Sequence, residues 1–195
     1  MTHLRREGLL IALRRLMRER RGVSAVEFAL ILPIMITLFI GGSEVTQGIT
    51  IKRKVTIATR TIADLVSQDV SVTDADLTAA FAATTTVLAP YSTGSFKMVI
   101  TNVWIDADGN VSVVWSKGYN GATERTTGSS VTLPNGLNAF PKTSLLWAEA
   151  EYKYTPTIGY VISGSIDLKD KVYLRPRLTS CVKRETGSQT IDCPA

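Results

Sequence analysis

Gly22, Val23 and Glu27 have the types and the spacing for one cleavage reaction and one charge pairing. They lie in RRGVSAVEFALILP, residues 20–33, where basic residues give way to an apolar run. Cleavage after Gly22 would leave an α-amine on Val23, and such an amine is protonated at neutral pH. In a packed bundle of such helices, this ammonium and the Glu27 carboxylate of a neighbour would neutralise each other. We therefore expect a processing site at Gly22–Val23 and an assembly role for Glu27.

Glu27 also has a simpler interpretation as a residue of the helix start. A carboxylate near a helix N-terminus interacts favourably with the helix dipole, and its side chain can reach the membrane surface. A charge costs about 2.5 to 3.5 kcal/mol at the bilayer centre and less near its edge. The carboxylate is therefore tolerable without a partner. However, the arginine pair and Gly22 directly precede Val23, where cleavage would create the ammonium, and this favours the assembly role.

The rest of the chain offers few groups for catalysis. The single histidine, His3, precedes Gly22, so a chain that begins at Val23 has none for Ser-His, Cys-His or His-metal chemistry. No Ser-Lys pair or carboxylate pair has a spacing that indicates catalysis. We therefore predict that the protein is not an enzyme and that it uses no cofactor, metal or small-molecule substrate.

Two cysteines, Cys181 and Cys193, lie near the C-terminus. In an oxidising compartment they would form a disulfide, and closing so short a loop would contribute about 2 to 3 kcal/mol. Two free thiols are the alternative. A zinc site would need about four ligands, and the sequence supplies no second cluster of Cys or His.

The net charge of the chain comes from its N-terminus. Residues 1–22 contain seven arginines, among them Arg20 and Arg21, and two glutamates, which accounts for the whole net charge of +5. From Val23 onward, basic and acidic residues balance. The distribution indicates a basic leader peptide, 1–22, and argues against a nucleic-acid-binding surface.

Residues 23–42 are the candidate transmembrane segment. As a helix, these 20 residues match a hydrocarbon core about 30 Å thick. Arginines cluster just before the segment, so the positive-inside rule predicts a cytoplasmic N-terminus and an exported C-terminal part. The alternative is a secretory signal cut near GGS, residues 41–43, but the long apolar run and Glu27 count against it.

The stretch around Gly22 resembles the prepilin processing motif of tight-adherence (Tad/Flp) pilus proteins, and more narrowly the TadE-like pseudopilins. Two later strings, EAEYKYTP (149–156) and YLRPR (173–177), match the tails of such domains more loosely. The matching residues within 20–46 are Gly22, Val26, Glu27, Phe28, Ala29, Pro33 and Glu44.

The resemblance implies a type IV pilin-like fold and a minor pseudopilin. A prepilin peptidase would cut after Gly22, and Glu27 and Phe28 would act in assembly with other Tad pilins or pseudopilins and the inner-membrane assembly platform. The implied roles are pilus assembly or initiation and surface adhesion. The implied location is a single-pass position in the inner membrane with a periplasmic C-terminal domain, or a place in an extracellular pilus.

Larger TadG-like relatives carry an adhesion domain with an Asp-x-Ser-x-Ser metal motif. The nearest string here is DVSVT, residues 69–73, which follows a helix-like run where that motif should follow a buried strand. The smaller TadE-like relative is therefore the better fit.

Beyond residue 42, the pattern predicts an α+β arrangement. Apolar residues at helical spacing predict an amphipathic helical stalk over 43–70, which could break at its glycines. Residues 71–195 are expected to form the extracytoplasmic domain. Within it, Thr73 and Asp76 resemble a capping box that opens a second helix, and Pro90 should end that helix. The glycines concerned are Gly41, Gly42 and Gly48.

Period-two patterns predict a small antiparallel sheet after the second helix. Segments 95–105 and 111–118 flank DADGN and predict a hairpin. Further strands are expected near 144–154 and 170–178, with Pro176 confining the last one to an edge or to its own end. The Gly- and Thr-rich segment 117–136 is expected to be a solvated surface loop.

The string DADGNVS, residues 106–112, also invites a calcium interpretation. Its acidic and amide side chains alternate as in a cation loop. Val111 stands where such a loop needs glycine, and Lys117 where it needs a bidentate glutamate. A hairpin turn is the better interpretation.

A second class of function remains open, which is a single-pass, membrane-anchored periplasmic binding or scaffold module that never enters a filament. It predicts an uncut N-terminus and no effect of mutating Glu27.

Overall fold

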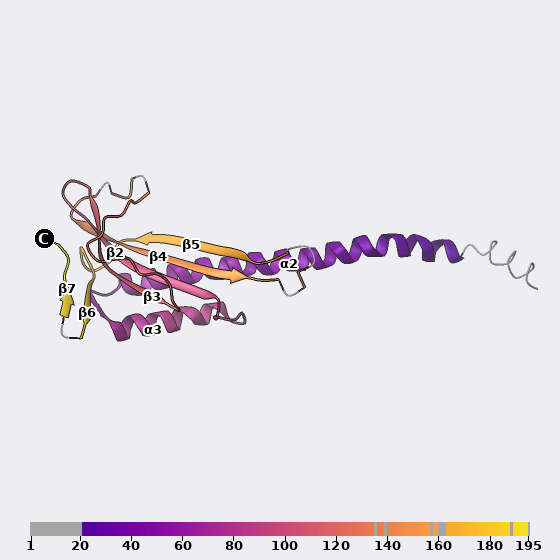
Figure 1. The fold of residues 1–195 in the computed structure, drawn as a ribbon, viewed down its shortest axis with the longest axis horizontal. Helices are drawn as coiled ribbons and strands as arrows, with labels where there is room; N and C mark the ends of the chain where they lie inside the picture. The colour runs from indigo at the N-terminus through magenta and orange to yellow at the C-terminus, as the bar shows by residue number, and fades with distance from the viewer. Residues whose placement is uncertain are drawn as a thin grey trace, which may run out of the picture.

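The computed structural model describes residues 21–134, 136–138, 140–156, 158–159, 163–187 and 189–194. The predicted leader up to Arg20 lies outside the described residues, as does the side chain of Arg21. A long helix projects at its N-terminal half from a small domain that contains a short helix and antiparallel strands (Figure 1). This arrangement confirms the predicted α+β class.

Helix α2, Arg21–Ser67, is unbroken over 47 residues, which corresponds to about 70 Å at the rise of an α-helix. It passes through Gly41, Gly42 and Gly48 without interruption. A Cβ placed on Gly48 would lie 3.4 Å from Cε1 of Tyr154. The glycine therefore lets the aromatic ring approach the helix closely, and this packing supports a helix that glycine alone would weaken.

A four-stranded antiparallel sheet packs beside the second half of α2 in the order β3-β2-β4-β5. The hairpin of β2, Phe96–Ile105, and β3, Val111–Tyr119, agrees with the predicted pair. Strand β4, Thr143–Tyr154, also lies where the sequence placed it. The alternation of apolar residues thus identified the three strands that carry most of the core.

The position of the last strand of this sheet, β5, differs from the sequence prediction. It runs over Ile166–Leu174 rather than 170–178. Its pairing with β4 extends from Ile166 opposite Tyr154 to Leu174 opposite Leu146. Pro176 lies beyond the end of the strand. The next residue, Arg177, donates its amide to the Ser67 carbonyl at 2.8 Å, which holds the chain against the end of α2.

The core lies between α2 and the inner face of this sheet. Side chains from both elements are fully buried there, and Trp115 is the largest of them. The helix contributes Ile51, Val55, Ala58, Ile62, Ala63 and Val66, and the strands contribute Phe96, Met98, Ile100, Trp115, Leu146 and Ala148.

Helix α3, Asp74–Thr85, and the 3-10 turn η1, Thr86–Leu88, flank α2 and end before Pro90 as predicted. The capping box is present. The Asp76 amide donates to Oγ1 of Thr73 at 3.1 Å, and the Thr73 amide donates to Oδ2 of Asp76 at 2.9 Å. The hydrogen bond from the Thr73 side chain lowers the pKa of Asp76, and the backbone bond adds to this effect.

A second, three-stranded sheet was not predicted from the sequence. It has the order β1-β6-β7 and consists of β1, Ser71–Thr73, β6, Lys183–Thr186, and β7, Gln189–Ile191. Strands β1 and β6 pair in parallel, with Ser71 opposite Lys183. The sheet therefore ties the C-terminal segment to the start of α3.

The turn between β2 and β3 is a hairpin turn, as the sequence analysis favoured. The side chain of Asp106 accepts hydrogen bonds from the amides of Asp108, at 2.9 Å, and Asn110, at 2.8 Å. The hydrogen bond from the Asn110 side chain is the main cause of a lowered pKa of Asp106. The carboxylate thus organises the turn itself.

The segment 117–136, predicted as a solvated surface loop, begins with the last residues of β3 and continues, in its described residues, without helix or strand. Ser130 forms a bridge with Ser112, which places the segment along the edge of β3. Leu133 is buried in a second cluster on the outer face of the sheet, where its buried neighbours are Val103, Ile105, Val111, Val113 and Leu145. The prediction of a solvated surface loop is thus confirmed for most of 120–136, and Leu133 is the buried residue among those described there.

Two isoleucines of α2 give a matched test of this packing. Ile62 is 0% exposed and Ile57 is 51% exposed on the same helix. We expect Ile62→Ala to lower the free energy of unfolding by about 2 to 5 kcal/mol, because it leaves a cavity in the core. Ile57→Ala should change it by less than about 0.5 kcal/mol. Denaturant titration of the full chain in detergent, followed by tryptophan fluorescence, measures both, and equal effects would contradict the described packing.

Candidate processing and assembly site

Gly22 and Val23 lie in the helical part of the chain that projects from the domain. An added Cβ on Gly22 would meet nothing within 4 Å, and Val23 is exposed. No side chain of the described residues therefore covers Gly22, although its backbone lies within the helix. Of the predicted leader charges, Arg20 is outside the described residues and only the backbone of Arg21 is described.

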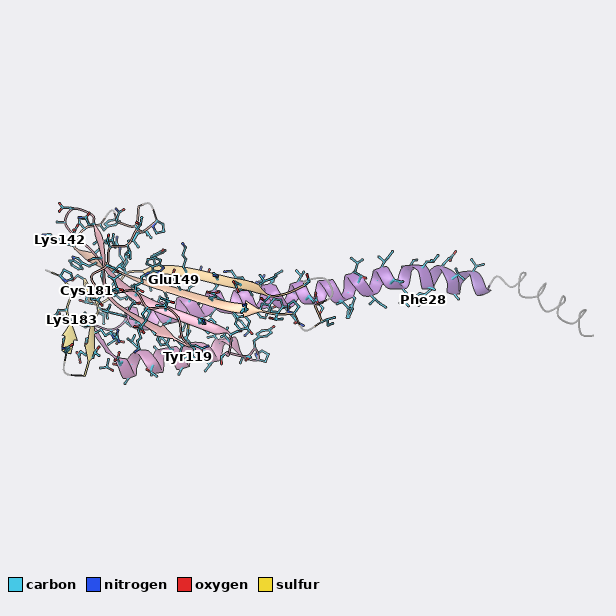
Figure 2. All side chains as sticks on the ribbon, viewed as in Figure 1. Phe28, Tyr119, Lys142, Glu149, Cys181 and Lys183 are labelled. Carbon is cyan, nitrogen blue, oxygen red and sulfur yellow. A yellow bond between two sulfur atoms is a disulfide. The ribbon has the colours of Figure 1, made fainter. Side chains whose placement is uncertain are left out.

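Glu27 follows Val23 by four residues, a spacing that places both on one face of a helix. Glu27 is exposed, and among the residues that the structure describes none forms an ion pair with it. Phe28 is 58% exposed and points away from the helix, far from the domain (Figure 2). The side chains expected to act in assembly are therefore presented outward.

The projecting half of α2 is exposed and largely apolar, with Glu27 as its one charged residue between Val23 and Gly41. Within the described part of the chain it is the one helix long and apolar enough to cross a membrane. This is consistent with a single-pass membrane anchor. The large exposed apolar residues of this half are Val23, Val26, Phe28, Leu30, Ile31, Leu32, Ile34, Met35, Ile36, Leu38 and Phe39.

Burial along the helix begins at Gly41 and Glu44. Glu44 is 3% exposed, and the Tyr154 hydroxyl donates to its backbone carbonyl at 3.1 Å. Burial raises the pKa of Tyr154, and the nearby charge of Glu44 raises it further. The phenol therefore stays protonated and available as a donor where the helix meets the domain.

Cys181 and Cys193 form a disulfide, with their Cα atoms 6.2 Å apart. The segment beside Cys181 is also fixed by two buried side chains. Nδ2 of Asn102 and Nε1 of Trp115 each donate to the carbonyl of Val182 at 2.8 Å. The disulfide and the assembly residues lie at opposite ends of the molecule (Figure 2), so the covalent link can stabilise the domain without touching the apolar helix.

We expect the disulfide to contribute about 2 to 3 kcal/mol to the free energy of unfolding. Adding reductant to the purified protein should therefore lower its unfolding midpoint. The double variant Cys181→Ser, Cys193→Ser should show the same lowered midpoint and no further response to reductant. Identical midpoints of the wild type with and without reductant would contradict a stabilising bridge.

An open cleft of about 710 Å³ lies on the outer face of the sheet. Its two glutamates are already paired, Glu149 with Arg125 at 2.5 Å and Glu151 with Lys169 at 3.3 Å. The guanidinium of Arg125 also stacks 3.7 Å above the Trp147 ring. Among the described residues, no group of three potential metal ligands comes together.

Sequence reasoning did not find the contact between α2 and Tyr154. Its partners, Glu44 and Gly48, are more than a hundred positions away in the chain. The string EAEYKYTP contains Tyr154. However, the sequence around a tyrosine in a strand does not indicate which residues of a distant helix it contacts. Only the register of the whole sheet places it there.

Comparison with known families bears on the helix rather than on the domain. The model of the family described as TadE-like protein matches residues 22–64. This match confirms the resemblance found in the sequence and covers Gly22, Glu27 and Glu44. The chain is thus similar, over α2, to proteins associated with Tad pili. Neither a curated protein nor a solved structure matches it.

Proposed function

We propose that this protein is a minor pseudopilin of a Tad/Flp pilus that acts in pilus assembly or initiation and in surface adhesion. The observation that carries the proposal is that the N-terminal half of α2 is apolar, stands clear of the domain and presents Glu27 outward. The family match over 22–64 supports the same function.

In this function a prepilin peptidase cuts between Gly22 and Val23. Both residues are helical in the uncut chain, so the local turn has to open before the peptide bond can be attacked. A glycine in a helix is about 1 kcal/mol less stable than alanine. Gly22 therefore lowers the cost of opening this turn, and it also leaves the approach to the bond free of a side chain.

The new α-amine of Val23 then pairs with Glu27 of a neighbouring subunit. An unpaired charge within the membrane is unfavourable, and pairing it in a helix bundle removes part of that cost. The pairing also fixes the axial position of one helix against the next. Phe28 and the other exposed apolar residues supply the packing surface for other Tad pilins or pseudopilins and for the assembly platform.

The proposed arrangement has four parts along the chain. Residues 1–22 are a cytoplasmic leader, 23–42 span the inner membrane, 43–70 form the stalk and 71–195 the periplasmic domain. The helix of the stalk ends at Ser67. Periplasmic export of the domain agrees with the disulfide, because such bonds persist in oxidising compartments.

A membrane-anchored periplasmic binding module is the second candidate, and the open cleft beside Glu149 and Glu151 is the feature that favours it. The two functions differ in where the mature protein is found. Sheared and purified pili should contain this protein with Val23 as its first residue. Recovery of an uncut chain from the membrane alone, in cells that make pili, would support the anchored module instead.

A further inference from the structure

The end of the domain nearest the apolar half of α2 exposes two isoleucines. Ile158 is 62% exposed and Ile166 is 41% exposed. Together with the exposed Gly159 they form what we call the apolar tip. The sequence from Thr155 to Ser165 contains no Asp, Glu, Lys or Arg. Exposed isoleucines next to uncharged chain are suited to an apolar environment.

The position of the tip along α2 follows from the contacts of Tyr154. Ile166 is opposite Tyr154 in the register of β4 and β5. The Tyr154 hydroxyl reaches the Glu44 carbonyl, and its ring lies against Gly48. Strand β4 points along α2 toward its apolar half (Figure 1). Ile158 follows Tyr154 by four residues, so it lies at most about 13 Å of chain beyond this contact.

The outer boundary of the membrane falls at the same level. In the proposed span, 23–42, the large exposed apolar residues end at Phe39, and burial against the domain begins at Gly41. A span of this length fills the hydrocarbon core. The bilayer surface on the domain side is therefore expected close to Gly42, beside the level of Glu44 at which the tip begins.

We infer that the apolar tip inserts into the outer surface of the lipid bilayer beside the helix. The inference rests on the membrane span of the proposed function, but not on processing or pilus assembly. The interfacial region accepts apolar side chains and still hydrates the polar backbone around them. Lys153 and Asp167, opposite each other in register, are the nearest charged residues on either strand and remain exposed. The tip thus has apolar ends and a polar margin, as an interfacial contact requires.

Insertion at a second point would fix how the domain sits on the membrane. A single helix leaves the domain free to tilt, whereas the tip and α2 together hold it at one depth and orientation. The subunit would then present the outer face of its sheet in a constant direction before it leaves the membrane.

The test uses the full chain in phosphatidylcholine vesicles, with an environment-sensitive fluorophore on a single added cysteine. The positions are Ile158→Cys in the tip, Leu30→Cys in the span and Leu178→Cys as the control. Leu178 is 69% exposed. It adjoins Arg177, whose backbone amide donates a hydrogen bond to the Ser67 carbonyl at the C-terminal end of α2, away from the membrane span. Lipids that carry a nitroxide quencher on the headgroup or deep in the acyl chain report the depth of each position.

We expect headgroup quenchers to reduce emission at 158, deep quenchers to reduce it at 30, and neither to affect 178. Quenching at 30 without quenching at 158 would overturn the inference and leave the membrane span intact. Absence of quenching at 30 would overturn both. Emission at 158 that shifts to the blue with protein concentration, but resists lipid quenchers, would overturn the inference in favour of a second copy of the chain.

Discussion

Glu27→Ala is expected to remove this protein from pili while leaving cleavage after Gly22 intact. Among the described residues Glu27 has no partner in its own chain, so its loss should not disturb the fold. In the proposed bundle, however, the mutation would leave the Val23 ammonium of a neighbour unpaired. Removing one partner of a buried ion pair costs about 3 to 5 kcal/mol, and even about 2 kcal/mol corresponds to roughly thirtyfold weaker association.

The matched variant is Glu27→Asp, which keeps the charge on a shorter side chain. It should retain part of the incorporation, whereas Glu27→Gln should behave like Glu27→Ala. Immunoblots of sheared pili and of membranes, together with the N-terminal sequence of the membrane form, separate assembly from processing. Normal incorporation of the alanine variant would remove the role assigned to Glu27.

Gly22→Lys is expected to abolish processing. The space around Gly22 is open in the folded chain, and an added Cβ meets nothing within 4 Å. A lysine there should therefore leave folding and membrane insertion unchanged, and its effect should arise at the peptidase. A long charged side chain beside the scissile bond blocks the close approach that glycine permits.

Two alanine variants serve as controls for this experiment. Gly22→Ala adds little volume and should still be cut. Gly42→Ala lies in the same helix in a similarly open position and should be cut as the wild type is. Intact mass spectrometry distinguishes cut from uncut chains in each case. Complete cleavage of the Gly22→Lys chain would show that the peptidase does not recognise Gly22.

The parts of the fold that were predicted are those with a strong local signal. The capping box of Thr73 and Asp76 and the β2–β3 hairpin each depend on residues close together in sequence. Helix α2 was predicted from its apolar residues, with a break at its glycines left open. The helix is continuous, and at Gly48 the packing of Tyr154 supports it. Local patterns of this kind are readable because the interactions that enforce them are also local.

The parts that were missed depend on pairing between distant segments. Strands β6 and β7 are short and polar, with sequences KRET and QTI, and β6 pairs with β1, which lies more than a hundred positions earlier. Strand β5 begins with Ile166 and Leu168 at alternate positions, but the next position on the same face is Asp170, which pairs with Lys52 of α2 and interrupts the apolar pattern. Register with β4, rather than composition, sets its bounds.

The residues of the candidate site were likewise predicted where the signal is local and missed where it depends on distant contacts. Gly22, Val23, Glu27 and Phe28 were identified from a contiguous motif, and the structure describes where they lie without testing what they do. The burial of Glu44 against Tyr154 depends on a contact across the fold and was not predicted. The exposure of Ile158 likewise follows from where β4 ends relative to α2.

The most direct test of the central claim is the intact mass and N-terminal sequence of this protein from cells with and without a prepilin peptidase. The account predicts a chain that starts at Val23 only when the peptidase is present, and the full-length chain when it is absent. A full-length chain in both would contradict it and favour the membrane-anchored module, and a start near residue 43 would contradict it in favour of an ordinary secreted domain.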